Sequence, residues 1–182
     1  HWMVHSFPTR RSSDLLAWPL LRRYGYRAHL FVPTAKVGRS WQGLQVCSWE
    51  QLRQMSESGT MLIESHTHDL HWKLETPRGW EPAFLHPGRL AAAGPADDGS
   101  VLDEGAAADA GDAAAAGDAA ELPPAMRSAL GGTWGAVARD LLASRRAITA
   151  QVGRAPGFLA WPYGFASAAL DSVAAAAGFA GT

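Results

Sequence analysis

The chain has 182 residues, 47% hydrophobic and 18% charged, which is the composition of a globular protein about one domain long. A formal net charge of -1 gives no basis for binding nucleic acid or an anionic membrane surface. The single cysteine, Cys47, excludes an internal disulfide and a cysteine-rich metal site, and no apolar run is long enough to span a bilayer.

Residues 1–15 are interpreted as a non-native leader. The string from His5 to Leu15, HSFPTRRSSDL, follows neither the helical nor the strand period and matches one reading frame of a common short-read sequencing adapter. We therefore expect natural sequence to resume near Leu16, and we assign no function to the leader. It contains no basic region followed by an apolar stretch, so it does not have the pattern of a signal peptide.

From residue 16 onward, predicted helices and strands alternate. The signals include a capping box formed by Ser48 and Gln51, and glycines that end helices, such as Gly25 and Gly153. In chain order the predicted elements are a helix at 17–24, a strand at 28–33, a helix at 48–57, a strand at 61–64, a helix ending at 152, a strand at 157–160, a helix at 167–177 and a strand from 179. This alternation predicts an α/β fold with a parallel sheet or barrel.

Residues 91–123 differ in composition from the rest of the chain. They hold fourteen alanines, eight acidic residues and no lysine or arginine. Such a stretch buries little apolar surface and has no opposite charge to pair with, so it predicts a disordered or loosely helical insertion at the surface.

Three of the seven histidines, His66, His68 and His71, lie within six positions directly after the predicted strand at 61–64. Neutral imidazole is the commonest protein ligand of first-row divalent metals, and a neighbouring carboxylate such as Asp69 can join or orient the rings. Surface histidines or one buried histidine would be the ordinary interpretation of a single such residue. Three beside an acidic residue at a strand end favour a metal site.

The residues alone leave the ligand pair open. If His66 and His71 bind the ion, His68 and Asp69 point elsewhere. If His66 and His68 bind it, the site resembles the His-x-His motif of amidohydrolases and histidinol-phosphatase-like phosphoesterases. Those families carry that motif on their first strand, whereas a helix, a strand and another helix precede it here.

A second motif, Trp161-Pro162-Tyr163-Gly164, follows the predicted strand at 157–160 and precedes a helix capped by Ser167. Proline and glycine make it a turn, and on its own it would be structural, with its aromatic side chains packed below. A turn at this place exposes backbone N–H groups, which can stabilise a developing oxyanion.

Together these segments resemble the polysaccharide deacetylase (NodB-homology) family, and most closely its poly-N-acetylglucosamine branch. The resemblance covers residues 16–182 except the insertion, and it rests on residues 20–33, 48–52, 64–71 and 161–164 in the family's order. It implies a partial (β/α) barrel of the NodB-like type, truncated at both ends.

The resemblance also implies the chemistry of the site. His66 and His71 match the two histidines that hold a divalent metal (zinc, nickel, cobalt or iron) with an aspartate, and Tyr163 matches the residue whose backbone N–H helps form the oxyanion hole. Trp161 and Tyr163 match aromatics that bind substrate. The implied reaction is hydrolysis of an N-acetyl group, a carbon–nitrogen amide bond that is not a peptide bond, on an N-acetylglucosamine exopolysaccharide of biofilms. The implied location is the cell envelope, periplasmic or extracellular.

One departure from the family bears on activity. The family's acidic motif, a Phe-Asp-Asp-Gly-like segment, belongs just before Leu16, where the adapter-like string stands. Asp14 is part of that string and is not assigned as a ligand. The third metal ligand and the catalytic base are therefore absent, and the chain as written is predicted to be inactive. An alternative from another class is a non-catalytic glycan-binding relative that retains Trp161 and Tyr163.

Overall fold

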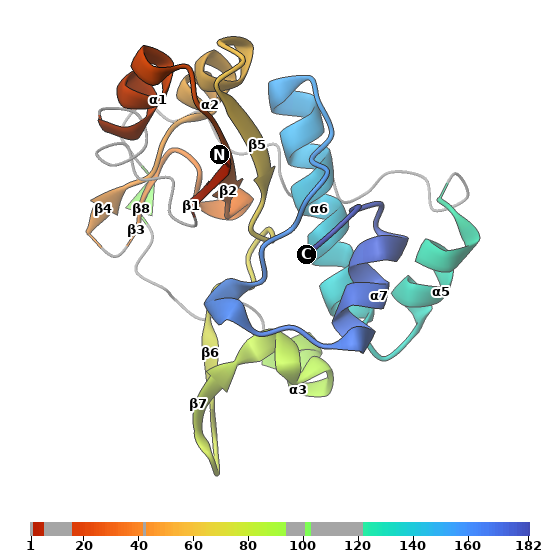
Figure 1. Ribbon diagram of the computed structural model, residues 1–182. Helices are drawn as coiled ribbons and strands as arrows, with labels where there is room; N and C mark the ends of the chain where they lie inside the picture. The colour runs from red at the N-terminus through yellow and green to blue at the C-terminus, as the bar shows by residue number, and fades with distance from the viewer. Residues whose placement is uncertain (1, 6–15, 42, 94–100, 103–121) are drawn as a thin grey trace.

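The computed structural model describes residues 2–5, 16–41, 43–93, 101–102 and 122–182. Its main sheet is parallel and consists of β1 (Trp2–His5), β2 (Arg27–Val32) and β5 (Met61–Ser65), in that spatial order. Isolated parallel bridges extend this sheet from Ser65 to Leu159 and from Phe158 to Gly181. Helices lie beside these strands, so the predicted α/β class is confirmed and the arrangement is one wall of a (β/α) barrel (Figure 1).

The helices that connect the strands begin and end at the residues that the sequence indicates. The larger ones are α1 (Trp18–Tyr24), α2 (Trp49–Glu57), α6 (Gly135–Val152) and α7 (Ala168–Ala176). At the start of α2, the Gln51 N–H donates to Ser48 Oγ at 3.3 Å and the Ser48 N–H donates to Gln51 Oε1 at 2.8 Å, which completes the capping box. Helices α1 and α6 end at glycines in the left-handed region, Gly25 and Gly153.

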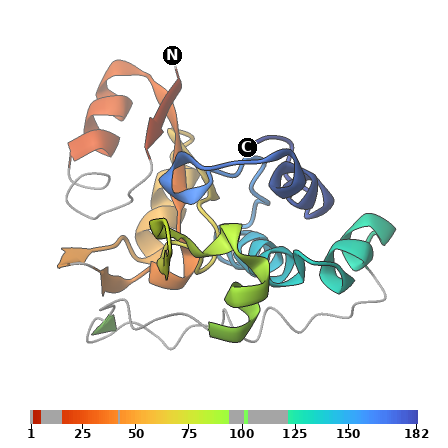
Figure 2. The same ribbon diagram turned by 90° about the horizontal axis from the view of Figure 1, so that it is seen from below.

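Two groups of buried side chains form the core. The N-terminal core lies between the sheet and the helices α1 and α2 and is made of Leu21, Ala28, Leu30, Val32, Val37, Cys47, Leu52, Met55, Met61, Ile63 and Ile148. The C-terminal core lies among α3 (Pro87–Ala93), α5 (Pro124–Gly131), α6 and α7, and includes Leu70, Phe84, Met126, Leu141, Leu159, Trp161 and Leu170. Helix α6 contributes to both, through Ile148 and Leu141, and therefore joins the two halves (Figures 1 and 2).

Several shorter elements were not predicted from the sequence. A hairpin of β6 (Lys73–Thr76) and β7 (Gly79–Pro82) projects from the molecule directly after the histidines (Figure 1). Further short elements are β3 (Arg39–Trp41), β4 (Leu44–Gln45) and the 3-10 segments η2 (Thr34–Lys36), η3 (Ala83–Leu85) and η5 (Pro162–Gly164).

The two predicted C-terminal strands are reduced to single bridges. At the predicted strand 157–160, the N–H groups of Gly157 and Phe158 donate to the side chain of Glu64 instead of a backbone carbonyl, so regular pairing is limited. Near 179, the Phe179 N–H donates to the Ala174 carbonyl at the end of α7. The Ala180 N–H donates to the Gly157 carbonyl, and the parallel bridge lies at Gly181.

The leader and the insertion are described only in part. Within residues 1–15, Trp2–His5 form β1 beside β2, and residues 6–15, including Asp14, lie outside the described residues. Within 91–123, α3 continues to Ala93 and a short strand, β8 (Val101–Leu102), pairs with β3. Residues 94–100 and 103–121 lie outside the described residues, so the interpretation of both segments stays a prediction.

Candidate active site

The histidine loop, residues 65–71, leaves the carboxyl end of β5 and is bonded to both neighbouring strand segments. The His66 N–H donates to the Val32 carbonyl at 2.9 Å, and His66 Nδ1 lies 2.8 Å from the Ala160 carbonyl oxygen. Because a carbonyl only accepts, Nδ1 carries the proton and Nε2 carries the lone pair. The side chain is almost completely buried, at 3% exposure, so the ring is held in one orientation.

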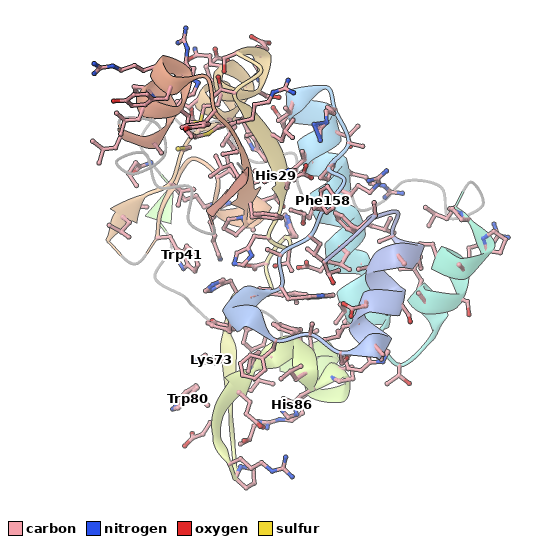
Figure 3. The ribbon with its side chains drawn as sticks, viewed as in Figure 1. His29, Trp41, Lys73, Trp80, His86 and Phe158 are labelled. Atoms are coloured by element: carbon pink, nitrogen blue, oxygen red, sulfur yellow. The ribbon has the colours of Figure 1, made fainter. Side chains whose placement is uncertain are left out.

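The fold brings the ring of His71 to that of His66. Their ring centroids are 5.2 Å apart, and the His71 ring also lies 4.5 Å from the ring of Tyr163 and 4.9 Å from that of Trp41. Trp41, from β3, packs its ring nearly perpendicular to the imidazole. Trp41 and Lys73 lie on the same side of the molecule, near β3 and at the base of the hairpin (Figure 3). The two predicted ligands and Tyr163 therefore form one cluster.

The other polar residues of the loop contact different partners. His68 Nδ1 lies 2.8 Å from the hydroxyl of Thr34, and Asp69 forms an ion pair of 2.7 Å with the buried Lys36. Within this loop, and among the described residues, the ring of His66 contacts the ring of His71 and not that of His68. The loop geometry thus groups His66 with His71 and directs Asp69 to η2.

Burial keeps the clustered imidazoles in their neutral form. Desolvation, followed by the proximity of His71, lowers the pKa of His66 to about 4, against the opposing effect of the bond to Ala160. Burial also lowers the pKa of His71, and the Lys36 and Lys73 ammonium groups act in the same direction. Neutral imidazole is the form that binds a metal, so both rings are suited to this role near neutral pH.

The aromatic turn, residues 161–164, faces the histidines through Tyr163. Its backbone has φ 61° and ψ 8°, a left-handed conformation that is uncommon for a residue with a side chain. The backbone hydrogen bonds of this turn are donated by Gly164 and Phe165 to the carbonyls of Trp161 and Pro162, and neither uses the Tyr163 N–H. Strained backbone of this kind is frequent at functional sites.

The two aromatics of the turn have different surroundings. Tyr163 is 37% exposed, whereas Trp161 is 6% exposed, stacks on Phe84 at 5.5 Å and places its Nε1 3.3 Å from an oxygen of Asp171. Trp161 thus packs below the turn, as the structural interpretation of this motif expects, and offers little surface to a ligand. Tyr163 is the aromatic at the surface of the site, and burial of part of its side chain raises the pKa of its hydroxyl.

A cation lies beside this exposed ring. Lys73, the first residue of β6, places Nζ 4.6 Å from the centroid of the Tyr163 ring. Since Lys73 follows His71 by two residues, the hairpin joins the histidine loop to the aromatic turn. Neither Lys73 nor Trp41 is predicted as a site residue from the sequence, because nothing in their local pattern indicates a site.

Two carboxylates hold the backbone of this region. Glu64, with no exposed surface, accepts from the N–H groups of Gly157 at 2.7 Å and Phe158 at 2.9 Å, and from the guanidinium of Arg154 at 3.1 Å. His29, at 3.2 Å from the same carboxylate, packs its ring against Phe158 (Figure 3).

The second carboxylate is Asp140 on α6. It accepts from the backbone N–H groups of His68 and Asp69, each at 2.7 Å. Burial raises the pKa of Asp140 to about 6, against the lowering effect of nearby His68 and of the two hydrogen bonds. The roles of Glu64 and Asp140 are not predictable from the sequence, because their partners are distant in the chain.

The residues present fit part of a metal site. Two neutral imidazoles, one oriented by a carbonyl, are donors typical of zinc, nickel, cobalt and iron sites. Within the described ranges, no three side chains among histidine, cysteine, aspartate and glutamate gather closely enough to hold an ion together. The described helices also include none that is long and apolar enough to cross a bilayer.

A family model described as polysaccharide deacetylase matches residues 10–83. The poly-beta-1,6-N-acetyl-D-glucosamine N-deacetylase of Staphylococcus aureus (strain MSSA476) is 38% identical over 56 residues, which cover 30% of this chain and 19% of that protein. The protein of the same name from Staphylococcus epidermidis is 41% identical over 56 residues, with the same coverage. The matched segment therefore spans about a fifth of the curated relatives.

Solved structures match over nearly the whole chain. IcaB from Ammonifex degensii has a TM-score of 0.65 at 23% identity, covering 97% of this chain and 55% of that one. The BpsB deacetylase domain from Bordetella bronchiseptica has a TM-score of 0.63 at 23% identity, covering 97% and 60%. A de-N-acetylase from Aggregatibacter actinomycetemcomitans has a TM-score of 0.62 at 18% identity, covering 97% and 59%. These likenesses establish the fold, a partial (β/α) barrel of the type found in deacetylase domains.

Proposed function

We propose that the intact protein is a metal-dependent hydrolase of the polysaccharide deacetylase family, whose model matches residues 10–83, and that it removes N-acetyl groups from an N-acetylglucosamine polymer. The observation that carries this proposal is the meeting of His66, His71 and Tyr163 at the carboxyl end of parallel strands. Active sites of parallel α/β folds lie at that end. The names of the curated relatives support the substrate class.

In this proposal His66 and His71 hold a divalent cation. His66 presents Nε2 because its Nδ1 proton is engaged by Ala160, and His71 is held by the rings of Trp41 and Tyr163. When bound, the ion would polarise the acetyl carbonyl and activate a water molecule.

The Tyr163 backbone N–H has the role of stabilising the oxyanion of the tetrahedral intermediate, and the exposed Tyr163 ring contacts the sugar. A carboxylate has to take the proton of the attacking water. The family supplies this base, and the third metal ligand, from an Asp-Asp motif before the first helix. No Asp-Asp pair precedes Leu16 in this chain.

We therefore propose that the chain as written binds metal weakly and does not release acetate. A missing general base alone reduces the rate by about a hundred- to ten-thousand-fold. The intact protein would act on a polysaccharide at the cell envelope, in the periplasm or outside the cell, as the family resemblance implies.

Restoring the acidic segment tests the activity. The gene would be resequenced across the codons for residues 1–16, the natural segment would be returned to the chain, and acetate release from poly-N-acetylglucosamine and chitooligosaccharide would be measured. Release is expected from the restored protein and not from the chain as written. A restored protein that binds the glycan but frees no acetate would support a glycan-binding module instead.

A zinc titration tests the ligand pair. His66→Ala and His71→Ala are each expected to abolish saturable zinc binding. His68→Ala is expected to retain it, because the ring of His68 is hydrogen-bonded to Thr34 in the wild type. An intact zinc site in His71→Ala, together with its loss in His68→Ala, would favour a His-x-His hydrolase. Cobalt and nickel titrations of the same variants would narrow the identity of the metal.

A further inference from the structure

We infer that Asp140 is a positioning residue of this site, which sets the separation of His66 and His71 through the backbone of the loop between them. This inference rests on the proposed metal-binding role of the two histidines. It goes beyond that role because Asp140 lies on α6, outside both motifs identified in the sequence.

The contact is a double hydrogen bond to the centre of the histidine loop. The two oxygens of Asp140 each accept one backbone N–H, from His68 at 2.7 Å and from Asp69 at 2.7 Å. Hydrogen bonds to a charged acceptor are short and about twice as strong as neutral ones. Two such bonds from one rigid side chain fix both the position and the direction of the peptide that they hold.

A second contact from the same helix holds the start of the loop. Ser144, one turn after Asp140 on α6, lies with its Oγ 2.7 Å from Ser65 Oγ. Residues four apart share a helix face, so α6 holds the loop at two points. The neighbouring side chain Leu141 is completely buried in the C-terminal core, which makes this helix a rigid support.

The loop needs this support because its conformation is strained. Thr67, between the two points of contact, has φ 69°, and a β-branched residue in this region costs on the order of 1 kcal/mol or more. His71 follows Asp69 by two residues, and Leu70 between them is buried. The position of the Asp69 peptide therefore determines where the His71 ring lies relative to His66.

The same geometry excludes two other roles for Asp140. Both carboxylate oxygens face amide hydrogens, so Asp140 replaces neither the missing third metal ligand nor the missing base. Its action on the site passes through the loop backbone.

The test compares zinc affinity with fold stability in variants of the full chain. Asp140→Asn keeps the size of the side chain but leaves one acceptor oxygen and turns an NH2 group toward an N–H donor. Removing a group that orients metal ligands weakens metal binding by about 10- to 100-fold, and this is the expected loss. Val137→Ala, on the same helix and fully buried, is the matched control: it should lower the urea midpoint while zinc affinity of the folded protein changes less than about threefold.

A metal-free measurement completes the test. In the wild-type chain the His66 and His71 rings are close enough for a nuclear Overhauser contact, and Asp140→Asn is expected to weaken it and to speed hydrogen exchange at the His68 and Asp69 amides. An Asp140→Asn protein that folds, keeps the ring contact and binds zinc within about threefold of wild type would overturn the inference. Failure of the proposed function has another signature, zinc binding that is unaffected by His66→Ala and His71→Ala.

Discussion

Burial of His66 determines its protonation state in the folded protein. Burial of the ring and the proximity of His71 disfavour the imidazolium form of His66 in the folded protein, although the Nδ1 proton is hydrogen-bonded to the Ala160 carbonyl. The consequence is a pH dependence of stability whose direction follows from the pKa.

The folded-state pKa of His66 is about 4 and the unfolded value is 6.5. Between these values the unfolded chain binds a proton that the folded chain does not, so the stability contribution is complete above pH 6.5 and declines as the pH falls toward 4. The free energy of unfolding, measured by urea with a chelator present, should fall by about 2 kcal/mol more in the wild type than in His66→Gln between pH 7 and pH 5. Asp140, with its raised pKa, acts in the opposite direction but in both proteins, so it cancels in the comparison. Equal losses in the two proteins would contradict a neutral His66.

The backbone of Tyr163 provides a second test at this scale. At φ 61° an alanine has the same steric cost as tyrosine, whereas glycine does not. Tyr163→Gly should therefore be more stable than Tyr163→Ala by about 1 kcal/mol, as measured by urea unfolding. At Ala150, an exposed helical position on α6, the order should reverse, and Ala150→Gly should destabilise by about 0.5 to 1 kcal/mol. A Tyr163→Ala protein as stable as the glycine variant would argue against the left-handed turn.

Among the elements, β5 contacts the segment at 157–160 through backbone hydrogen bonds of Ser65 and through the carboxylate of Glu64. Glu64 offers a charged acceptor to two adjacent N–H groups, where a regular parallel strand would use backbone carbonyls. Ala160, whose carbonyl orients His66, donates its own N–H to the Ser65 carbonyl at 2.9 Å, and Glu64 holds the two residues that begin this segment.

Glu64→Gln should lower the free energy of unfolding by at least about 2 kcal/mol, because one buried N–H and the Arg154 guanidinium lose a charged acceptor. The measurement is urea unfolding at neutral pH. Glu50→Gln, which removes the exposed partner of Arg53 on α2, should change stability by less than about 0.5 kcal/mol. Similar effects of both substitutions would mean that Glu64 does not hold this segment.

The elements that are predictable from the sequence are those with local signals of their own. The α2 cap at Ser48, the glycine after α6 and the strand that ends at the histidines depend on residues adjacent in the chain, and the structure agrees with each. The grouping of His66 with Tyr163 could be predicted from the sequence because each residue lies in a recognisable motif. The roles of Asp140 and Glu64 could not be predicted, because they depend on partners more than seventy positions away that only the fold brings close.

At the level of the whole molecule, α6 joins the N-terminal and C-terminal cores. Leu141 lies in one core and Ile148 in the other, two turns apart on a single helix. A helix shared in this way couples the unfolding of the two cores.

Leu141→Ala should lower the free energy of unfolding by about 2 to 5 kcal/mol. Met126 in the C-terminal core and Met55 in the N-terminal core provide methyl signals for NMR during urea unfolding. Both signals are expected to disappear together at a lower urea concentration than in the wild type. Loss of the Met126 signal while that of Met55 persists would show that the cores unfold independently.

The spatial order of the parallel segments equals their order in the chain, and this bears on assembly during translation. As the polypeptide leaves the ribosome, β5 meets β2 already present, residues 158–159 meet β5, and Gly181 arrives last at the newest edge. The histidine loop is different. It is synthesised about seventy residues before Asp140, so its backbone acquires its final support only when α6 has emerged.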